Sequence, residues 1–152
     1  MSKEYTRIDF IKINGRITSF TNEYDFLAPT YNIEFNYMGS HWISIQQAYN
    51  SLVEENFNTH RKLMLMGNII YSCYSQNEEL TQKLLSTKTA WLQNSVKNHD
   101  NFWHNCNCSD CFMENGENYY GRLVMEVRDY IIWQRKRKTK TSKRWALRYF
   151  NR

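Results

Sequence analysis

The sequence predicts one α+β domain that is mainly helical, with a small N-terminal β-sheet and a basic C-terminal helix or tail. Three observations predict this class. An Asn-Gly pair separates two β-prone runs near the N-terminus, apolar residues recur at helical spacing in four later segments, and the C-terminal end is strongly basic. A length of 152 residues with 41% hydrophobic residues suits one domain around one core.

The β-prone segments come first. Residues 9–13 and 16–20 flank Asn14-Gly15, and an Asn-Gly pair between such runs predicts a hairpin because both turn positions need positive φ. A second extended stretch, residues 31–38, alternates so that Ile33, Phe35 and Tyr37 share one face, and Gly39 closes it.

The helical segments follow. Ser44 begins the first, and Gln47 three residues later completes a capping box. The second is expected over about residues 61–74, and the third after a cap at Asn77. The fourth begins near Asn118 and continues into the basic tail. The apolar residues expected to face inward are Ile45, Ala48, Tyr49, Leu52, Leu63, Met66, Ile70, Cys73, Leu80, Leu84, Leu85, Tyr120, Leu123, Val124, Val127 and Ile131.

The bulk properties predict a cytoplasmic location. No apolar run is long enough for a bilayer, and residues 1–16 alternate polar and apolar residues without the apolar stretch of a signal peptide. In a reducing compartment the four cysteines are expected to be free or metal-bound, not paired in disulfides.

The charge is unevenly distributed. The net charge is +5, but the last acidic residue is Asp129, and the nine basic residues beyond it leave the rest of the chain mildly acidic. We therefore divide the chain into a domain of residues 1–132 and a basic, aromatic extension of residues 133–152, with residues 136–143 as the one candidate linker.

The extension predicts contact with RNA or single-stranded DNA. Cations neutralise phosphates, and Trp133, Trp145, Tyr149 and Phe150 offer rings on which unpaired bases stack. The alternatives are an acidic protein partner, or a solvated helix end whose aromatic residues dock on the domain. The candidate nucleic-acid-binding residues are Arg135, Lys136, Arg137, Lys138, Lys143, Arg144 and Arg148.

A short Cys- and His-rich segment is a candidate metal site. His104, Cys106, Cys108 and Cys111 lie within eight residues, and zinc prefers four nitrogen or sulfur ligands in a tetrahedron. The Cys108-x-x-Cys111 spacing is that of a zinc knuckle, whereas Cys106-x-Cys108 is tighter. The alternative to a structural zinc is a mobile loop with incidental cysteines.

Five segments occur in an order typical of one protein family. They are Phe26–Tyr31, Ser44–Asn50, Leu84–Thr87, Asp100–Trp103 and Gly116–Arg128. Together they resemble the NADAR (YbiA-like) family of N-glycosidases over about residues 18–132. The last segment is the specific one, because it keeps the family's Gly-x-Asn-x-x-Gly-x-x-x-Met-x-x-Arg intervals.

The resemblance implies chemistry on an N-glycosidic bond. Characterised members of the family cleave ribosylated substrates, including a riboflavin-pathway intermediate and ADP-ribose attached to guanine, and the family requires no cofactor. Such cleavage passes through an oxocarbenium-like state that needs a nearby carboxylate or nucleophile and an acid for the leaving base. The family places a Glu and a Lys on its first helix for this work.

This chain departs from the family at both positions. The family Glu falls on Gln46 and the family Lys on Val53, while the Asn of the opening segment falls on Pro29. Neither a Gln amide nor a Val side chain exchanges protons near neutral pH. Glu54, Glu55 or Asp100 would have to supply a substitute carboxylate. The resemblance therefore implies a domain that binds a nucleotide-like ligand with impaired catalysis.

The resemblance also implies a set of site residues. Gln46 and Asp100 are the candidates for the catalytic positions, although Asp100 alternatively caps the residues before Trp103. The candidate ligand-binding residues are Phe26, Tyr31, Trp103, Asn118, Gly121 and Arg128. Trp103 would stack on a base or sugar unless it is core, and Asn118 and Gly121 would meet a phosphate at a helix start unless they only cap and pack.

Three functions follow from these expectations. The first is a protein that binds ADP-ribosyl or other ribosylated nucleotides with weak or absent hydrolysis. The second is an active N-glycosidase or ADP-ribosyl glycohydrolase that uses rearranged residues on modified nucleic acid. The third is a non-enzymatic nucleic-acid or protein-binding module that reuses the fold.

Overall fold

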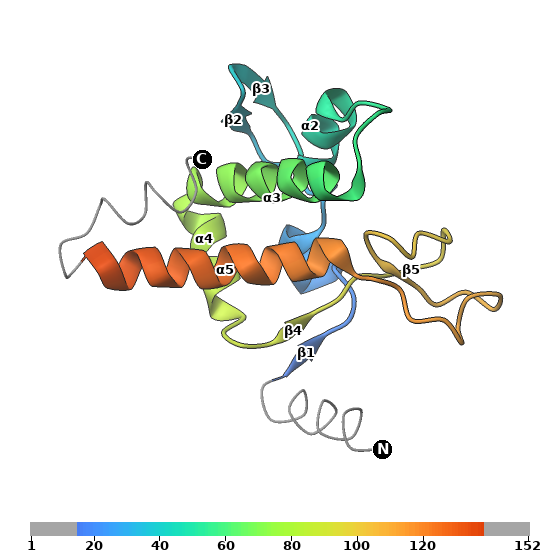
Figure 1. Cartoon of the computed structure of the whole chain (residues 1–152). Helices are drawn as coiled ribbons and strands as arrows, with labels where there is room; N and C mark the ends of the chain where they lie inside the picture. The colour runs from blue at the N-terminus through green and yellow to red at the C-terminus, as the bar shows by residue number, and fades with distance from the viewer. Residues whose placement is uncertain (1–14, 139–152) are drawn as a thin grey trace.

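The protein is an α+β domain in which two long helices lie side by side. A computed structural model of the chain describes residues 15–138. Helix α3 (Thr59–Ser75) packs against α5 (Tyr119–Lys138), while α2 (Ile45–Leu52) and α4 (Glu78–Ser86) pack on α3 (Figure 1). The predicted class, mainly helical with short strands, is confirmed. No helix within residues 15–138 combines the length and apolar character that crossing a membrane requires.

The strands form three small two-stranded sheets. β1 (Arg16–Ile17) pairs in parallel with β4 (Trp91–Leu92), and β5 (Ser95–Val96) pairs in parallel with β6 (Asn105–Cys106). β2 (Phe35–Tyr37) and β3 (Ser40–Trp42) form an antiparallel hairpin. These strands are too short to form a large sheet, so the packing of the helices dominates the core.

The N-terminal hairpin prediction falls partly outside the described residues, because its first arm, 9–13, and Asn14 lie there. Gly15 has the left-handed φ of +85° expected at the turn. The second arm is a strand only at Arg16–Ile17, and its partner among the described residues is β4. A 3-10 helix, η1 (Asn22–Leu27), follows and was not predicted.

The second extended stretch forms a shorter strand than predicted. Only Phe35–Tyr37 is β-strand, and the chain turns back through Met38 and Gly39, whose φ values of 52° and 74° suit a two-residue hairpin turn. The predicted face holds: Phe35 is buried, and Ile33 and Tyr37 pack against the core.

The helix starts follow their capping residues. Ser44 Oγ accepts the Gln47 N–H at 3.1 Å, and Gln47 Oε1 accepts the Ile43 N–H at 2.9 Å, which is the predicted capping box with the return bond shifted by one residue. Helix α3 begins earlier than predicted, because Asn58 Oδ1 accepts the Arg61 N–H at 2.9 Å.

The core lies between the helix pair and η1. The Tyr74 hydroxyl donates a hydrogen bond to the Phe26 carbonyl at 2.8 Å, so this fully buried tyrosine keeps a partner. Most of the apolar residues predicted to face inward are buried, and Leu52, Leu63, Leu85 and Leu123 are partly buried.

Helix α5 holds β4 through polar contacts on both sides of Leu92. Asn118 Nδ2 donates to the Leu92 carbonyl at 2.9 Å, and the Leu92 N–H approaches Met125 Sδ at 3.5 Å. Gly121 lies between them, where a Cβ would collide with the Leu92 carbonyl and stand 2.6 Å from Asn118 Oδ1. We call these contacts, together with those of Arg128 below, the β4 clasp.

Arg128 extends the β4 clasp to the turn after α4. Its guanidinium Nη1 donates to Thr87 Oγ1 and to the Ala90 carbonyl, both at 2.9 Å, and the side chain is buried. Burial lowers the pKa of Arg128, and the neighbouring Asp129 acts in the opposite direction. Both hydrogen-bonded partners are neutral, so the guanidinium fixes the chain path of residues 87–90.

The clasp predicts opposite effects for one substitution at two helical glycines. Gly121→Ala should lower the free energy of unfolding by about 3 kcal/mol, because the methyl group displaces the β4 backbone. Gly67→Ala on α3 should leave it unchanged or raise it by up to about 1 kcal/mol, since its Cβ would meet only Leu123 Cδ2 at 3.5 Å. Urea unfolding followed by circular dichroism measures both. Equal stability of the two variants would contradict the clasp.

Candidate functional site

Helix α2 carries Gln46, the first of the positions implied to be catalytic. Gln46, Tyr49 and Asn50 are spaced so that they follow one another along the helix, and Val53 is the C-cap residue just beyond its end. Gln46 Nε2 donates to Asn50 Oδ1 at 2.8 Å, and the Gln46 N–H donates to the Pro29 carbonyl at 2.8 Å. Gln46 is partly exposed and Asn50 exposed, so two neutral amides reach solvent where the family has a carboxylate.

Trp103 meets this face of α2 through Tyr49. The two rings pack edge to face with centroids 5.2 Å apart. Trp103 also packs edge to face on Phe102 at 4.7 Å, and Phe102 on Tyr119 at 5.0 Å. Trp103 and Phe102 are partly buried, and Trp103 also packs against the core, so the loop after β5 brings a partly accessible aromatic cluster beside α2.

Asp100 holds this loop in shape. Its Oδ1 accepts the N–H groups of Phe102 at 3.1 Å and of Trp103 at 2.9 Å, which is the capping role considered as the alternative to catalysis. The carboxylate therefore orients the aromatic pair, and it uses one oxygen to do so.

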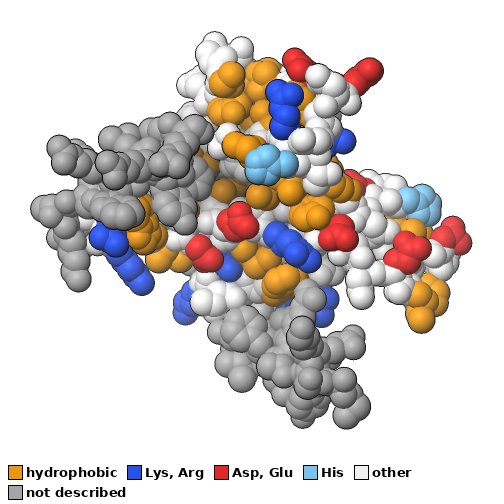
Figure 2. Space-filling model, viewed as in Figure 1, with side chains coloured by type: hydrophobic (Ala, Val, Ile, Leu, Met, Phe, Trp, Pro, Cys, Tyr) orange, Lys and Arg blue, Asp and Glu red, His pale blue; other side chains and the backbone are white. Residues whose placement is uncertain are grey.

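Cations border the aromatic cluster. Lys62 Nζ lies 6.0 Å from the centre of the Phe102 ring, and the Arg122 guanidinium lies 5.9 Å from that of Tyr119. Figure 2 shows one face of the molecule, on which Lys and Arg side chains alternate with acidic and hydrophobic ones. Lys62 thus offers a positive charge to an anionic group on a ligand, while the Asp100 carboxylate is a negative charge beside Phe102.

Several implied ligand-binding residues have packing roles instead. Phe26 is a core residue, and Asn118, Gly121 and Arg128 form the β4 clasp. All four are buried. The conserved spacing implied by the family resemblance is thus explained here by the docking of β4 on α5.

Three N–H groups at the start of α5 already have carbonyl partners. The N–H groups of Asn118, Tyr119 and Tyr120 donate to the carbonyls of residues 104, 102 and 103, at 3.3, 3.2 and 2.9 Å. These bonds favour capping and packing, the alternative to the phosphate role expected at this helix start.

Tyr31 lies apart from the other implied ligand residues. It lines a pocket of about 310 Å³ at the start of α4, and of the implied site residues it alone borders this pocket. The residues that complete the lining are Ile33, Gln76, Asn77, Glu78, Glu79, Leu80 and Lys83.

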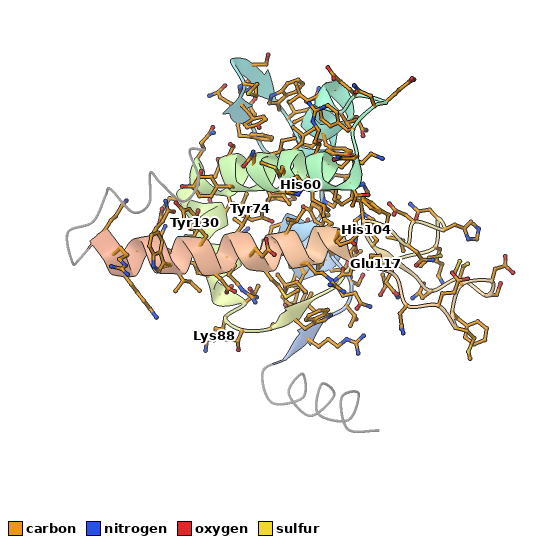
Figure 3. All side chains as sticks on the ribbon, viewed as in Figure 1. His60, Tyr74, Lys88, His104, Glu117 and Tyr130 are labelled. Carbon is orange, nitrogen blue, oxygen red and sulfur yellow. The ribbon has the colours of Figure 1, made fainter. Side chains whose placement is uncertain are left out.

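The structure brings one histidine and three cysteines together. The side-chain ligand atoms of His99, Cys106, Cys108 and Cys111 all lie within 4.8 Å of one another, and such a group can hold a metal ion. We call these four residues the Cys3His cluster. The predicted histidine, His104, is replaced by His99. The His104 ring instead packs on Tyr120 of α5, with centroids 5.7 Å apart (Figure 3).

Cys106 and Cys111 differ in acidity. Burial raises the pKa of Cys111 to about 12, and the two neighbouring thiols add to the shift. Burial also acts to raise the pKa of Cys106, but hydrogen bonds from Cys108, the His99 backbone and Cys111 outweigh it and lower the pKa overall. Cys106 thus holds a negative charge more readily than Cys111.

The basic extension is described only as far as Lys138. The boundary set at residue 132 falls inside α5, which continues to Lys138. Arg135 donates to both oxygens of Glu78 at 2.9 and 3.1 Å, and Arg137 lies 5.4 Å from the Trp133 ring. Lys143, Arg144 and Arg148 lie outside the described residues, and nucleic-acid binding stays a prediction.

Sequence reasoning missed four residues of these sites. Asn50 and Tyr49 lie one turn beyond Gln46, and helical spacing alone would have placed them on its face. Lys62 had no comparable signal, because only the tertiary fold brings α3 to the loop after β5. His99 lies in that loop, seven residues before Cys106, and it was missed because the shortest window of His and Cys residues contains His104.

Comparison with known proteins supports the fold. The structure is similar to the NMR structure of the E. coli protein YbiA, with a TM-score of 0.62 over 86% of this chain and 89% of that chain, at 17% sequence identity. No family model matches the sequence, and no curated protein matches it. At this identity the likeness shows the fold alone, and it confirms that the chain has a NADAR-like, YbiA-like fold.

Proposed function

We propose that this protein binds an ADP-ribosyl or related ribosylated nucleotide at the face formed by α2 and residues 100–103, and that N-glycosidase chemistry there is impaired. The observation that carries the proposal is the contact between Tyr49 and the partly accessible Trp103 ring, whose centroids lie 5.2 Å apart. Tyr49 lies one turn after Gln46, so this contact brings Trp103 near the Gln46 position. The YbiA-like fold supports it, because the resemblance implies substrate chemistry at the start of this helix.

The side chains on this face suit the parts of such a ligand. The amides of Gln46 and Asn50 offer donors and acceptors to ribose hydroxyls. Trp103 and Phe102 offer aromatic surface to a base, and Lys62 beside Phe102 offers a cation to a phosphate. A binding site with few polar groups beside aromatic ones is the usual composition of a nucleotide site.

The same face lacks the groups that cleavage requires. Gln46 is uncharged, and Val53 ends α2 with its side chain packed against the core. Asp100 is engaged in capping through Oδ1, and Glu54 and Glu55 are exposed in the turn after α2. Loss of a positioned acid-base group typically lowers a rate by about 10²–10⁴-fold, so binding is expected to outlast turnover.

The proposal first predicts that the full chain binds ADP-ribose. Isothermal titration should detect a complex that Gln46→Ala and Trp103→Leu each weaken by about tenfold, through a lost hydrogen bond and a lost stacking surface. Gln82→Ala is the matched control, because Gln82 Nε2 makes the same kind of 2.8 Å bond, to Glu78, on α4.

Three outcomes of that titration decide the proposal. Weakening by both site variants with an unchanged Gln82 variant supports it, provided that circular dichroism shows each variant folded. No heat with ADP-ribose argues against it. Equal binding by all variants moves the ligand elsewhere, and the pocket at Tyr31 would then be the next place to look.

Restored catalysis is the second prediction. The native chain should release little ADP-ribose from ADP-ribosylated guanine nucleic acid, whereas Gln46→Glu combined with Val53→Lys should release at least about tenfold more. The substitutions return a carboxylate to α2 and an amine to its C-cap position. Released ADP-ribose is measured by chromatography.

The matched control moves the carboxylate by one residue. Gln47→Glu with Val53→Lys adds the same charges, but residue 47 lies at the capping box and not on the Gln46 face. Its activity should equal that of the native chain. Robust turnover by the native chain that Gln46→Ala abolishes would contradict impaired catalysis and favour an active glycosidase.

A further inference from the structure

Residues 97–117 form a lobe that stands out from the helix pair (Figures 1 and 2). Its buried side chains are those of His104, Cys106 and Cys111, while Phe112 and Met113 at its outer part are 66% and 81% exposed. A segment of this size without an apolar core of its own ordinarily needs a disulfide or a metal to hold it. Groups other than an apolar core must therefore hold residues 97–117 together.

Two side-chain amides hold the base of the lobe. Asn101 Oδ1 accepts the Cys106 N–H at 2.8 Å, and Asn105 Oδ1 accepts the Gly116 N–H at 2.8 Å. These bonds fix β6 and the return of the chain to α5. They do not reach the outer turn at Cys108–Cys111, which the Cys3His cluster joins to His99.

The turn at Cys108–Cys111 has the form of a knuckle. The Cys111 N–H donates to the Cys108 carbonyl at 3.1 Å, which turns both thiols toward the same side. The Cys106 sulfur accepts the His99 N–H at 3.3 Å. Backbone donors of this kind stabilise a sulfur that carries negative charge, as a metal-bound thiolate does.

We propose that the Cys3His cluster is a structural zinc site, with Nδ1 of His99 and the three cysteine sulfurs as ligands. His99 Nδ1 lies 3.3 Å from Cys111 Sγ and 3.4 Å from Cys108 Sγ. Zinc bonds of about 2.3 Å to sulfur and 2.0–2.1 Å to nitrogen in a tetrahedron set N···S distances of about 3.6 Å. The two N···S distances are therefore close to the edge length of a zinc tetrahedron, and the other pairs of ligand atoms lie within 4.8 Å.

The donor set selects zinc among the common metals. Three thiolates and an imidazole form one of the usual structural zinc sets, and four protein ligands leave no position open for substrate. Magnesium and calcium prefer oxygen ligands, and none of the four groups supplies one. All four ligands come from residues 99–111, so the ion closes this segment on itself.

The zinc site has a structural consequence for its neighbours. His99 has a left-handed φ of 67°, and Asp100, Phe102 and Trp103 follow it directly. Anchoring His99 to the knuckle therefore fixes the N-terminal end of the loop that presents Trp103 to α2. The assignment itself depends only on the Cys3His cluster, not on any ligand of α2.

Metal content of the full chain tests the assignment. Protein purified under reducing conditions without chelator should contain one zinc per chain by elemental mass spectrometry, and cobalt substitution should give the visible bands of a tetrahedral thiolate site. Cys108→Ser and His99→Asn should each lose most of the zinc, because three ligands hold the ion much less tightly. Circular dichroism should show the helices intact, since α3 and α5 pack outside the lobe.

The controls use the remaining residues of the same types. His60→Asn, at an exposed histidine at the start of α3, and Cys73→Ala, at the buried cysteine of α3, should keep the zinc. Folded native protein without metal, or with a disulfide among Cys106, Cys108 and Cys111, would overturn the site. Zinc retained by His99→Asn and lost in His104→Asn would overturn the choice of His99.

Discussion

The β4 clasp is the contact on which the rest of the structure depends. Asn118, just before α5, and Met125 and Arg128 on α5 each reach the backbone or side chains of residues 87–92, and Gly121 lets the two backbones approach. Because β4 pairs with β1 and leads into β5, this contact sets the direction in which the chain leaves the helix pair. The position of the loop at residues 100–103 follows from it.

This role explains why the most specific sequence motif said more about fold than about ligand. Its residues at 118, 121, 125 and 128 require one another through β4, and a buried arginine with neutral partners is costly unless its hydrogen bonds are kept. None of these contacts involves positions 46 or 53, so the packing of β4 on α5 does not depend on which residues stand there.

The sequence predicted the elements whose causes are local. The capping box at Ser44, the helical spacing of α3 to α5 and the inward face of Phe35 all depend on near neighbours. The partner of Arg16–Ile17 was not predictable, because β4 lies far along the chain. The same reason hid the buried roles of Asn118 and Arg128, whose partners lie far along the chain. His99 was missed for another reason: it is only seven residues from Cys106, but the shortest window of His and Cys residues contains His104.

Two neighbouring regions of the molecule have separate roles in the proposed function. The face of α2 offers amides and, through Tyr49, the Trp103 ring, while the lobe beyond it positions that ring. Chemical shifts on titration of labelled protein with ADP-ribose test the central claim most directly. We expect the NMR signals of the Gln46 and Asn50 side-chain amides and of the Trp103 indole N–H to shift together. Shifts confined to the pocket at Tyr31 and Lys83, with these three signals unmoved, would contradict it.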